Sequence, residues 1–101
     1  MNKQRRDALE KVKSQIETEL SSLEDTSSRL EDLKADLESL KDEEQEYFDN
    51  MPESLQQGER GQNAEAAVNS LESAISDLDS LIDSLGSSQD IVSNIDEAIN
   101  Q

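Results

Sequence analysis

Cysteine, histidine and tryptophan are absent from this 101-residue sequence. Without cysteine and histidine the chain can form no disulfide, and it lacks the side chains on which zinc sites and most nucleophilic catalysis depend. The segment DLDSLIDSLG, residues 77–86, contains three aspartates but not the ligand order of a calcium-binding loop. We therefore predict no catalytic residue, no metal site and no cofactor, and we expect a protein that is not an enzyme.

Apolar and aromatic residues are scarce as well. Only 32% of the residues are hydrophobic and 2% are aromatic, which is too few for a large globular core. No stretch approaches the run of about 18 apolar residues that a membrane-spanning helix requires. The basic segment 1–13 lacks the apolar run of a signal peptide. We expect a soluble, cytoplasmic protein with no membrane partner.

Positive charge is concentrated at the start of the chain. Residues 1–13 carry a net charge of +3, whereas residues 14–61 carry −11 and residues 62–101 carry −8. The total of −16 disfavours direct binding to nucleic acid or to an anionic membrane. It favours a basic protein as partner.

What the sequence does contain is a heptad pattern. With Leu9 at position a, the a row is Leu9, Ile16, Leu23, Leu30, Leu37 and Glu44, and the d row is Val12, Glu19, Thr26, Leu33, Leu40 and Tyr47. Nine of these twelve residues are apolar, and no Gly or Pro interrupts residues 2–51. The pattern predicts one long coiled-coil-like helix over 3–49, with both rows facing a paired helix.

The second half of the chain carries a wider apolar stripe over 62–100. Its rows are Ala64, Leu71, Leu78, Leu85, Val92 and Ile99; Ala67, Ala74, Leu81 and Ile95; and Val68, Ile75 and Ile82. Three apolar positions in seven predict a helix that contacts more than one neighbour. Because the phase continues from Leu85 to Val92, one helix with a kink at 86–88 is favoured over two separate helices.

The two apolar runs have nearly equal lengths, and a polar segment, 50–61, separates them. We predict a single all-α domain over 1–101, an antiparallel two-helix hairpin. Folding back places the basic residues of the start beside acidic residues of the end: Lys3, Arg5, Arg6, Lys11 and Lys13 beside Asp90, Asp96 and Glu97. One seam between two helices buries little apolar surface, so we predict a homodimer that forms a four-helix bundle. A different protein as partner is the alternative.

The segment YFDNMPESLQQGERG, residues 47–61, differs from the rest and is predicted to form the tip of the hairpin. It holds the only Phe, Tyr and Pro and two of the three Gly. Asn50 is expected to end the first helix in a left-handed conformation, and Pro52 to begin a short helix.

Two interpretations of the tip stay open. The aromatic residues could cap the open end of the bundle, or the tip could bind a partner. In the second case the binding residues are Tyr47, Phe48, Met51, Leu55 and Arg60, and the adjacent acidic surface consists of Asp42, Glu43, Glu46 and Asp49.

The stretch EEQEYFDNMPESLQ, followed by GERG, resembles a family of small acidic helical-hairpin proteins from bacteriophages and integrated mobile elements of bacteria. Only residues 43–61 carry the specific part of this similarity. The resemblance implies a helical hairpin of phage or mobile-element origin in a bacterial host cell, and it implies no activity. Gly58 stands where the family usually has Ser.

These observations favour a non-catalytic interaction protein. Rows of carboxylates could mimic a nucleic-acid backbone and inhibit a basic host nucleic-acid-binding or defence protein. The acidity could also serve solubility alone. A structural or scaffolding coiled coil is the main alternative. A sponge for a nucleotide signal is a weaker one, because the tip offers only Arg60 as a cation.

Overall fold

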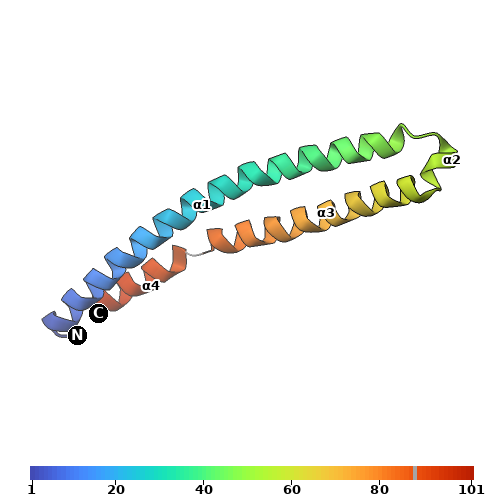
Figure 1. Ribbon diagram of the computed structural model, residues 1–101. Helices are drawn as coiled ribbons and strands as arrows, with labels where there is room; N and C mark the ends of the chain where they lie inside the picture. The colour runs from blue at the N-terminus through green and yellow to red at the C-terminus, as the bar shows by residue number, and fades with distance from the viewer. Residues whose placement is uncertain (88) are drawn as a thin grey trace. The chain divides into compact units, whose positions relative to one another are not determined.

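The computed structural model describes residues 1–87 and 89–101. All regular secondary structure in this part of the chain is helical: α1 spans Lys3–Asp49, α2 Glu53–Gln56, α3 Glu59–Gly86 and α4 Gln89–Ile99 (Figure 1). No strand occurs among these residues. The all-α fold class predicted from the heptad pattern is confirmed.

Helix α1 is continuous because no helix-breaking residue lies within it, and both of its ends have a physical cause. At the start, the Asn2 side-chain oxygen accepts a hydrogen bond from the Arg5 backbone N–H at 2.8 Å and thereby caps the helix. At the end, the Met51 N–H donates to the Phe48 carbonyl at 3.1 Å, which tightens the last turn. Pro52 has no N–H to continue the helix and disfavours helical geometry at the residue before it.

The expected left-handed conformation of Asn50 is wrong. No described residue has a positive φ angle. The Asn50 N–H still donates to the Glu46 carbonyl at 3.0 Å, so the helix ends by loss of donors at Pro52 and needs no left-handed residue.

Helix α3 begins at Glu59, earlier than the predicted residue 62, and it ends at Gly86, before α4 begins at Gln89. Two helices therefore occupy the range where the sequence favours one. The Ser87 hydroxyl donates back to the Asp83 carbonyl at 3.2 Å, and the Ser87 N–H donates to the Ser84 carbonyl. The predicted kink at 86–88 lies partly outside the described residues, since these omit Ser88.

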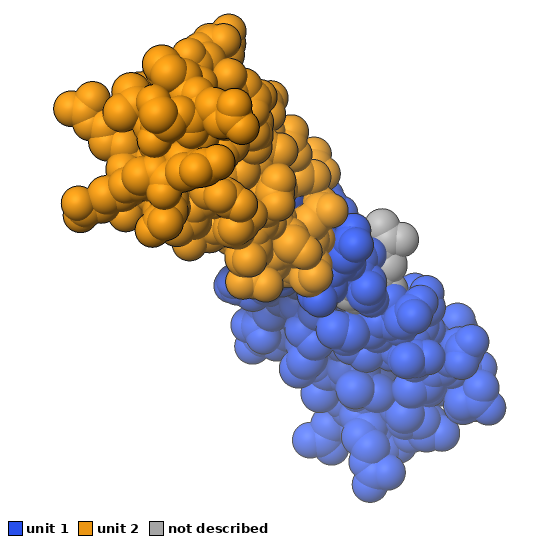
Figure 2. All heavy atoms as spheres, turned by 90° about the vertical axis from the view of Figure 1, so that its right-hand side faces the viewer, with its two compact units in different colours: residues 1–29, 82–101 blue, residues 30–81 orange. Residues whose placement is uncertain are grey.

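The chain divides into two compact units, coloured separately in Figure 2. Unit 1 consists of Met1–Arg29 and Ile82–Gln101. Within it, the Lys13 ammonium forms ion pairs with Asp96 and with Glu17, and Ile82 and Ile99 are buried. The predicted proximity of the basic start to the acidic end is confirmed for Lys13 and Asp96.

Unit 2 consists of Leu30–Leu81. Within it, the last part of α1 and the first part of α3 lie side by side and run in opposite directions, with α2 between them (Figure 1). The Lys34 Nζ lies 2.6 Å from Asp79 Oδ1 across the pair. Ala64 and Val68 of α3 are buried within this unit. This unit holds the tip and therefore the candidate site.

The rows of α1 that are covered within the chain differ from the prediction. Most of the a row is half-buried, but in the d row Leu33 and Leu40 are each 54% exposed and Tyr47 is 50% exposed. The second covered row is the e row, Arg6, Lys13, Leu20, Ser27, Lys34, Lys41 and Phe48, which is half-buried throughout. The prediction that the d row faces the paired helix is wrong.

The reason lies in the lysines of the e row. A lysine covers apolar surface with its methylene stem while its ammonium stays near water. Lys34 and Lys13 each reach an aspartate of the C-terminal half of the chain from this row. The e row is therefore covered although it looks polar, and the apolar d row is left exposed.

Candidate functional site

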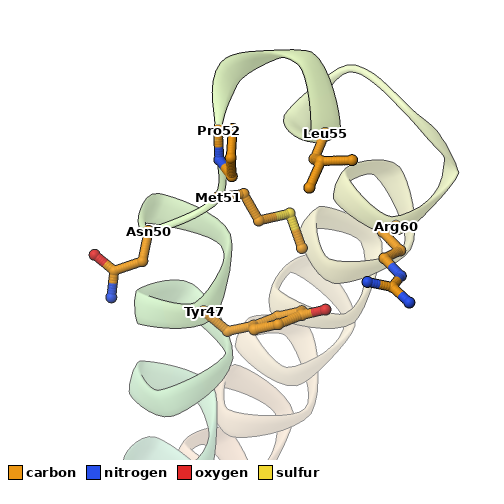
Figure 3. A pocket seen from close by; sticks show the side chains of 6 residues that line it. All are labelled: Tyr47, Asn50, Met51, Pro52, Leu55 and Arg60. Carbon is orange, nitrogen blue, oxygen red and sulfur yellow. The ribbon is translucent and has the colours of Figure 1, made fainter.

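A pocket of about 330 Å³ lies at the tip within unit 2. Six residues line it: Tyr47, Asn50, Met51, Pro52, Leu55 and Arg60. Tyr47 belongs to the last turn of α1, Leu55 to α2 and Arg60 to the first turn of α3. The side chains of Met51 and Leu55 point toward the Tyr47 ring, and the Asn50 side chain points away from it (Figure 3).

Backbone and side-chain hydrogen bonds hold the pocket together. The Gln56 side-chain amide donates to the Phe48 carbonyl at 3.0 Å. The Phe48 carbonyl, near the end of α1, thus accepts two hydrogen bonds, one from the Met51 N–H and one from Gln56. The Leu55 N–H donates to the Pro52 carbonyl at 2.9 Å, and the Gln62 N–H donates to the Gly58 carbonyl at 3.0 Å. The Gln56 bond ties α2 to α1, and the Gln62 side-chain amide, which donates to the Gln57 carbonyl at 3.4 Å, ties the start of α3 to the end of α2.

Gly61 permits the closest approach in this region. A Cβ atom built on Gly61 would lie 2.0 Å from the backbone oxygen of Gln56, far inside contact distance. Gly61 is buried, so α3 starts directly against the backbone of α2. By contrast, the nearest atom to a Cβ on Gly58 is the Leu55 oxygen at 3.5 Å, an ordinary contact.

The structure brings together four of the five predicted tip residues: Tyr47, Met51, Leu55 and Arg60. Phe48 is half-buried on the e row of α1 and does not line the pocket, although its carbonyl accepts the Gln56 bond. This difference follows from the helix itself, since adjacent residues of a helix point in directions about 100° apart.

Sequence reasoning did not predict Asn50 and Pro52 in the lining, nor Gln56 and Gly61 in the framework. The sequence does hold a signal for Gly61. A glycine within a helix lowers its stability, so its presence there indicates a close contact that leaves no room for a side chain. For Gln56 no signal distinguishes it from the neighbouring Gln57.

The predicted acidic surface lies on α1 next to the tip. Asp42, Glu43, Glu46 and Asp49 are all exposed. The Asp49 carboxylate accepts a hydrogen bond from the Gln45 side chain at 3.0 Å, and Asp42 lies 3.6 Å from the Lys41 ammonium. Across the described residues, no group of three or more acidic side chains is arranged to hold a metal ion. These carboxylates therefore present charge to the solvent.

Two lysines are held in the protonated state by their partners. The hydrogen bond to Asp96 raises the pKa of Lys13, against a smaller opposing effect of burial. The hydrogen bond to Asp79 raises the pKa of Lys34 in the same way. Each of these ammonium groups offsets one carboxylate of the same chain, and the net charge that a partner meets is still −16.

The lining of the pocket is mainly apolar and includes one cationic side chain. Tyr47, Met51, Pro52 and Leu55 supply apolar surface, and Arg60 supplies hydrogen-bond donors for an anionic or carbonyl group. The six lining residues include no pair of nucleophile and general base.

Comparison with known protein families, curated protein sequences and solved structures finds no match to this chain. The phage and mobile-element origin implied by residues 43–61 therefore stays a prediction. Within residues 1–87 and 89–101, no helix combines the length and the apolar character needed to cross a membrane.

Proposed function

We propose that this chain is a non-catalytic protein–protein interaction module, an antiparallel two-helix hairpin that dimerises into a four-helix bundle. Its origin would be a phage or mobile element, and its place of action the cytoplasm of a bacterial host. Its partner would be a basic host protein that binds nucleic acid or serves in defence. The acidic faces would occupy the surface on which that protein binds nucleic acid.

The observation that carries this proposal is the distribution of charge on the folded chain. The sequence holds 25 acidic and 9 basic residues, and the ammonium groups of Lys13, Lys34 and Lys41 already lie beside carboxylates of the same chain. The acidic residues next to the tip are exposed and lie on the same helix as Tyr47. A basic partner would meet a strongly negative surface with an apolar pocket at its end.

The test uses the full chain and a defined competitor. Proteins retained from a bacterial lysate on the immobilised chain are eluted with duplex DNA, and the affinity of each eluted protein is then measured with purified components. We expect basic nucleic-acid-binding proteins, and affinity that falls as salt rises. Retained proteins that are acidic or that DNA does not displace would contradict the proposal.

Charge variants locate the contact. The fourfold variant Asp42→Asn, Glu43→Gln, Glu46→Gln and Asp49→Asn removes the acidic surface beside the tip. The matched control removes four other exposed carboxylates of α1, through Glu10→Gln, Glu17→Gln, Glu24→Gln and Asp25→Asn. Binding should weaken more for the first set, whereas equal weakening would indicate that total charge alone matters.

A structural or scaffolding coiled coil is the second candidate, and the exposed d row of α1 favours it. A scaffold would assemble through this row into oligomers larger than a dimer. It would also tolerate alanine at Met51 and Arg60, which lie outside this row, without loss of assembly. Sedimentation at several concentrations separates the two candidates.

A further inference from the structure

An open apolar face lies on unit 2, and the part of the chain that the structure describes leaves it largely exposed. On α1 it consists of Leu33, Leu40 and Tyr47, which are about half exposed. On α3 it consists of Ala67, Ala74 and Leu81, of which Ala67 is half-buried, Ala74 is exposed and Leu81 is 49% exposed. Six apolar residues at seven-residue spacing on two adjacent helices are more than isolated surface residues would give.

The two rows lie on the same side of the helix pair. In each helix the exposed row comes three residues after a covered row, after Leu37 in α1 and after Leu71 in α3. Both helices are right-handed, and within unit 2 they run in opposite directions. An equal rotation away from the shared seam therefore turns both rows toward the same side.

The residues of the two rows also lie at matching levels. Counting from the contact between Lys34 and Asp79, six residues along α1 reach Leu40 and six residues back along α3 reach residue 73, beside Ala74. The same count places Tyr47 near Ala67 and Leu33 near Leu81. The face thus has large side chains along α1 and, toward the tip, small ones along α3.

The exposed area of the chain is large enough to accommodate an interface with a partner. The chain exposes 7423 Å², whereas a folded monomer of 11.2 kDa exposes about 5,700 Å². The excess of about 1,700 Å² exceeds the roughly 800 Å² that each partner buries in a protein interface of standard size. A second copy can cover this area without any new sequence.

We propose that a second copy packs on the open apolar face with the two-fold axis parallel to the helices, so that both tips lie at the same end. This inference rests on the proposed homodimer and specifies its geometry. Such an axis sets Leu40 against Ala74 of the second copy and Tyr47 against its Ala67. Large residues then meet small ones in every layer near the tip, which favours dense packing. The perpendicular axis would set Leu40 against Leu40 and leave the alanines facing each other.

This geometry makes one end of the dimer bivalent. Each tip pocket, with Tyr47 at its base and Arg60 at its rim, would have a second copy beside it. The partner that fits this end is one with two equivalent sites, such as a symmetric dimer.

Disulfide formation tests the geometry, and the natural absence of cysteine makes it unambiguous. The variants Leu40→Cys and Ala74→Cys are mixed, unfolded, refolded together and mildly oxidised. A disulfide requires Cα atoms about 4.4–6.8 Å apart, so it reports direct neighbours only. We expect covalent dimers in the mixture and none from Leu40→Cys alone. The control Ala35→Cys changes an exposed residue on another row of α1. It should give no covalent dimer, whether it is oxidised alone or mixed with Ala74→Cys.

The outcomes separate this inference from the homodimer on which it rests. Covalent dimers from Leu40→Cys alone would overturn the parallel axis while leaving the homodimer intact. A folded chain that sediments as a monomer would overturn the homodimer itself. Larger assemblies that cross-link through Leu40 would favour a scaffold and would also overturn the proposed geometry.

A charge reversal provides a second measurement that needs no cysteine. The proposed axis sets Asp36 at the rim near Asp77 of the second copy, and both residues are exposed within the chain. Replacing this repulsion by two ion pairs through Asp36→Lys should lower the dimer dissociation constant about 2- to 10-fold. The control Asp32→Lys makes the same change of charge on another row of α1. An equal effect of both variants would contradict the geometry.

Discussion

Helix α3 carries a glycine near its start and another at its end, and the two have opposite surroundings. At Gly61 an added Cβ would lie 2.0 Å from the Gln56 oxygen, whereas at Gly86 it would meet nothing within 4 Å. The first glycine is buried and the second is exposed. One is required by the contact between α2 and α3, and the other only lowers the helix propensity of its segment. A glycine at a helix end therefore carries no meaning until its neighbours in space are known.

Replacing Gly61 should give the largest effect. Gly61→Ala forces a methyl group against the Gln56 backbone, which cannot move aside as a flexible side chain could. We expect a loss of about 2–3 kcal/mol in the free energy of unfolding, the upper part of the range for overpacking. Urea denaturation followed by circular dichroism measures it.

Gly58→Ala is the matched control, three residues away in the same tip. Its Cβ would meet the Leu55 oxygen at an ordinary 3.5 Å, so we expect a change within about 0.5 kcal/mol. Equal losses in the two variants would show that α2 and α3 do not meet at Gly61 in the described way.

A second variant sharpens the comparison on the α2 side of the contact. Gln56→Ala removes the hydrogen bond to the Phe48 carbonyl at 3.0 Å, and we expect a loss of about 1 kcal/mol. Gln57→Ala, at an exposed position of the same type, should cost less. If the two variants were equally stable, the Gln56 bond would not hold the tip.

The opposite sign is expected at the other end of α3. Gly86→Ala places a methyl group in open space and restricts the unfolded chain, so it should stabilise by about 0.5–1 kcal/mol. The same denaturation experiment applies. A destabilised variant would mean that the end of α3 is as tightly packed as its start.

The ion pairs of the two units should have the smallest effect on the free energy of unfolding. Hydrogen bonds to Asp79 and Asp96 raise the pKa values of Lys34 and Lys13 above the usual 10.5. The stability that each lysine contributes is therefore fully present below pH 10.5 and is lost as the pH rises through the raised value. The unfolding free energies of the wild type and of Lys34→Met should differ by a constant amount up to about pH 10 and converge above it. A difference unchanged at pH 11.5 would exclude an electrostatic origin.

The sequence predicts the helices well, because heptad spacing and the absence of Gly and Pro over residues 2–51 act locally. It predicts the covered rows poorly, since Lys13, Lys34 and Lys41 are polar residue types and are nevertheless half-buried. Asn50 is a second case in which the prediction from sequence alone is wrong. Its tolerance of left-handed geometry is a local preference, and the hydrogen bonds around Pro52 made it unnecessary.

The sequence predicts part of the candidate site, namely the residues that stand out by type. Tyr47, Met51, Leu55 and Arg60 stand out by residue type, and the structure places them around one pocket. Gln56 and Gly61 act through a contact between α2 and α3, and no spacing within one helix reports such a contact.

Sedimentation equilibrium of the unmodified chain tests the central proposal most directly. If the exposed row of Leu33, Leu40 and Tyr47 is the surface for a second copy, the folded protein should have twice the chain mass of 11.2 kDa over a wide concentration range. The Leu40→Glu variant should shift toward the single-chain mass. The control variant Ala35→Glu, changed on another row of α1, should stay dimeric. A fully helical wild-type chain of 11.2 kDa at every concentration would contradict the account.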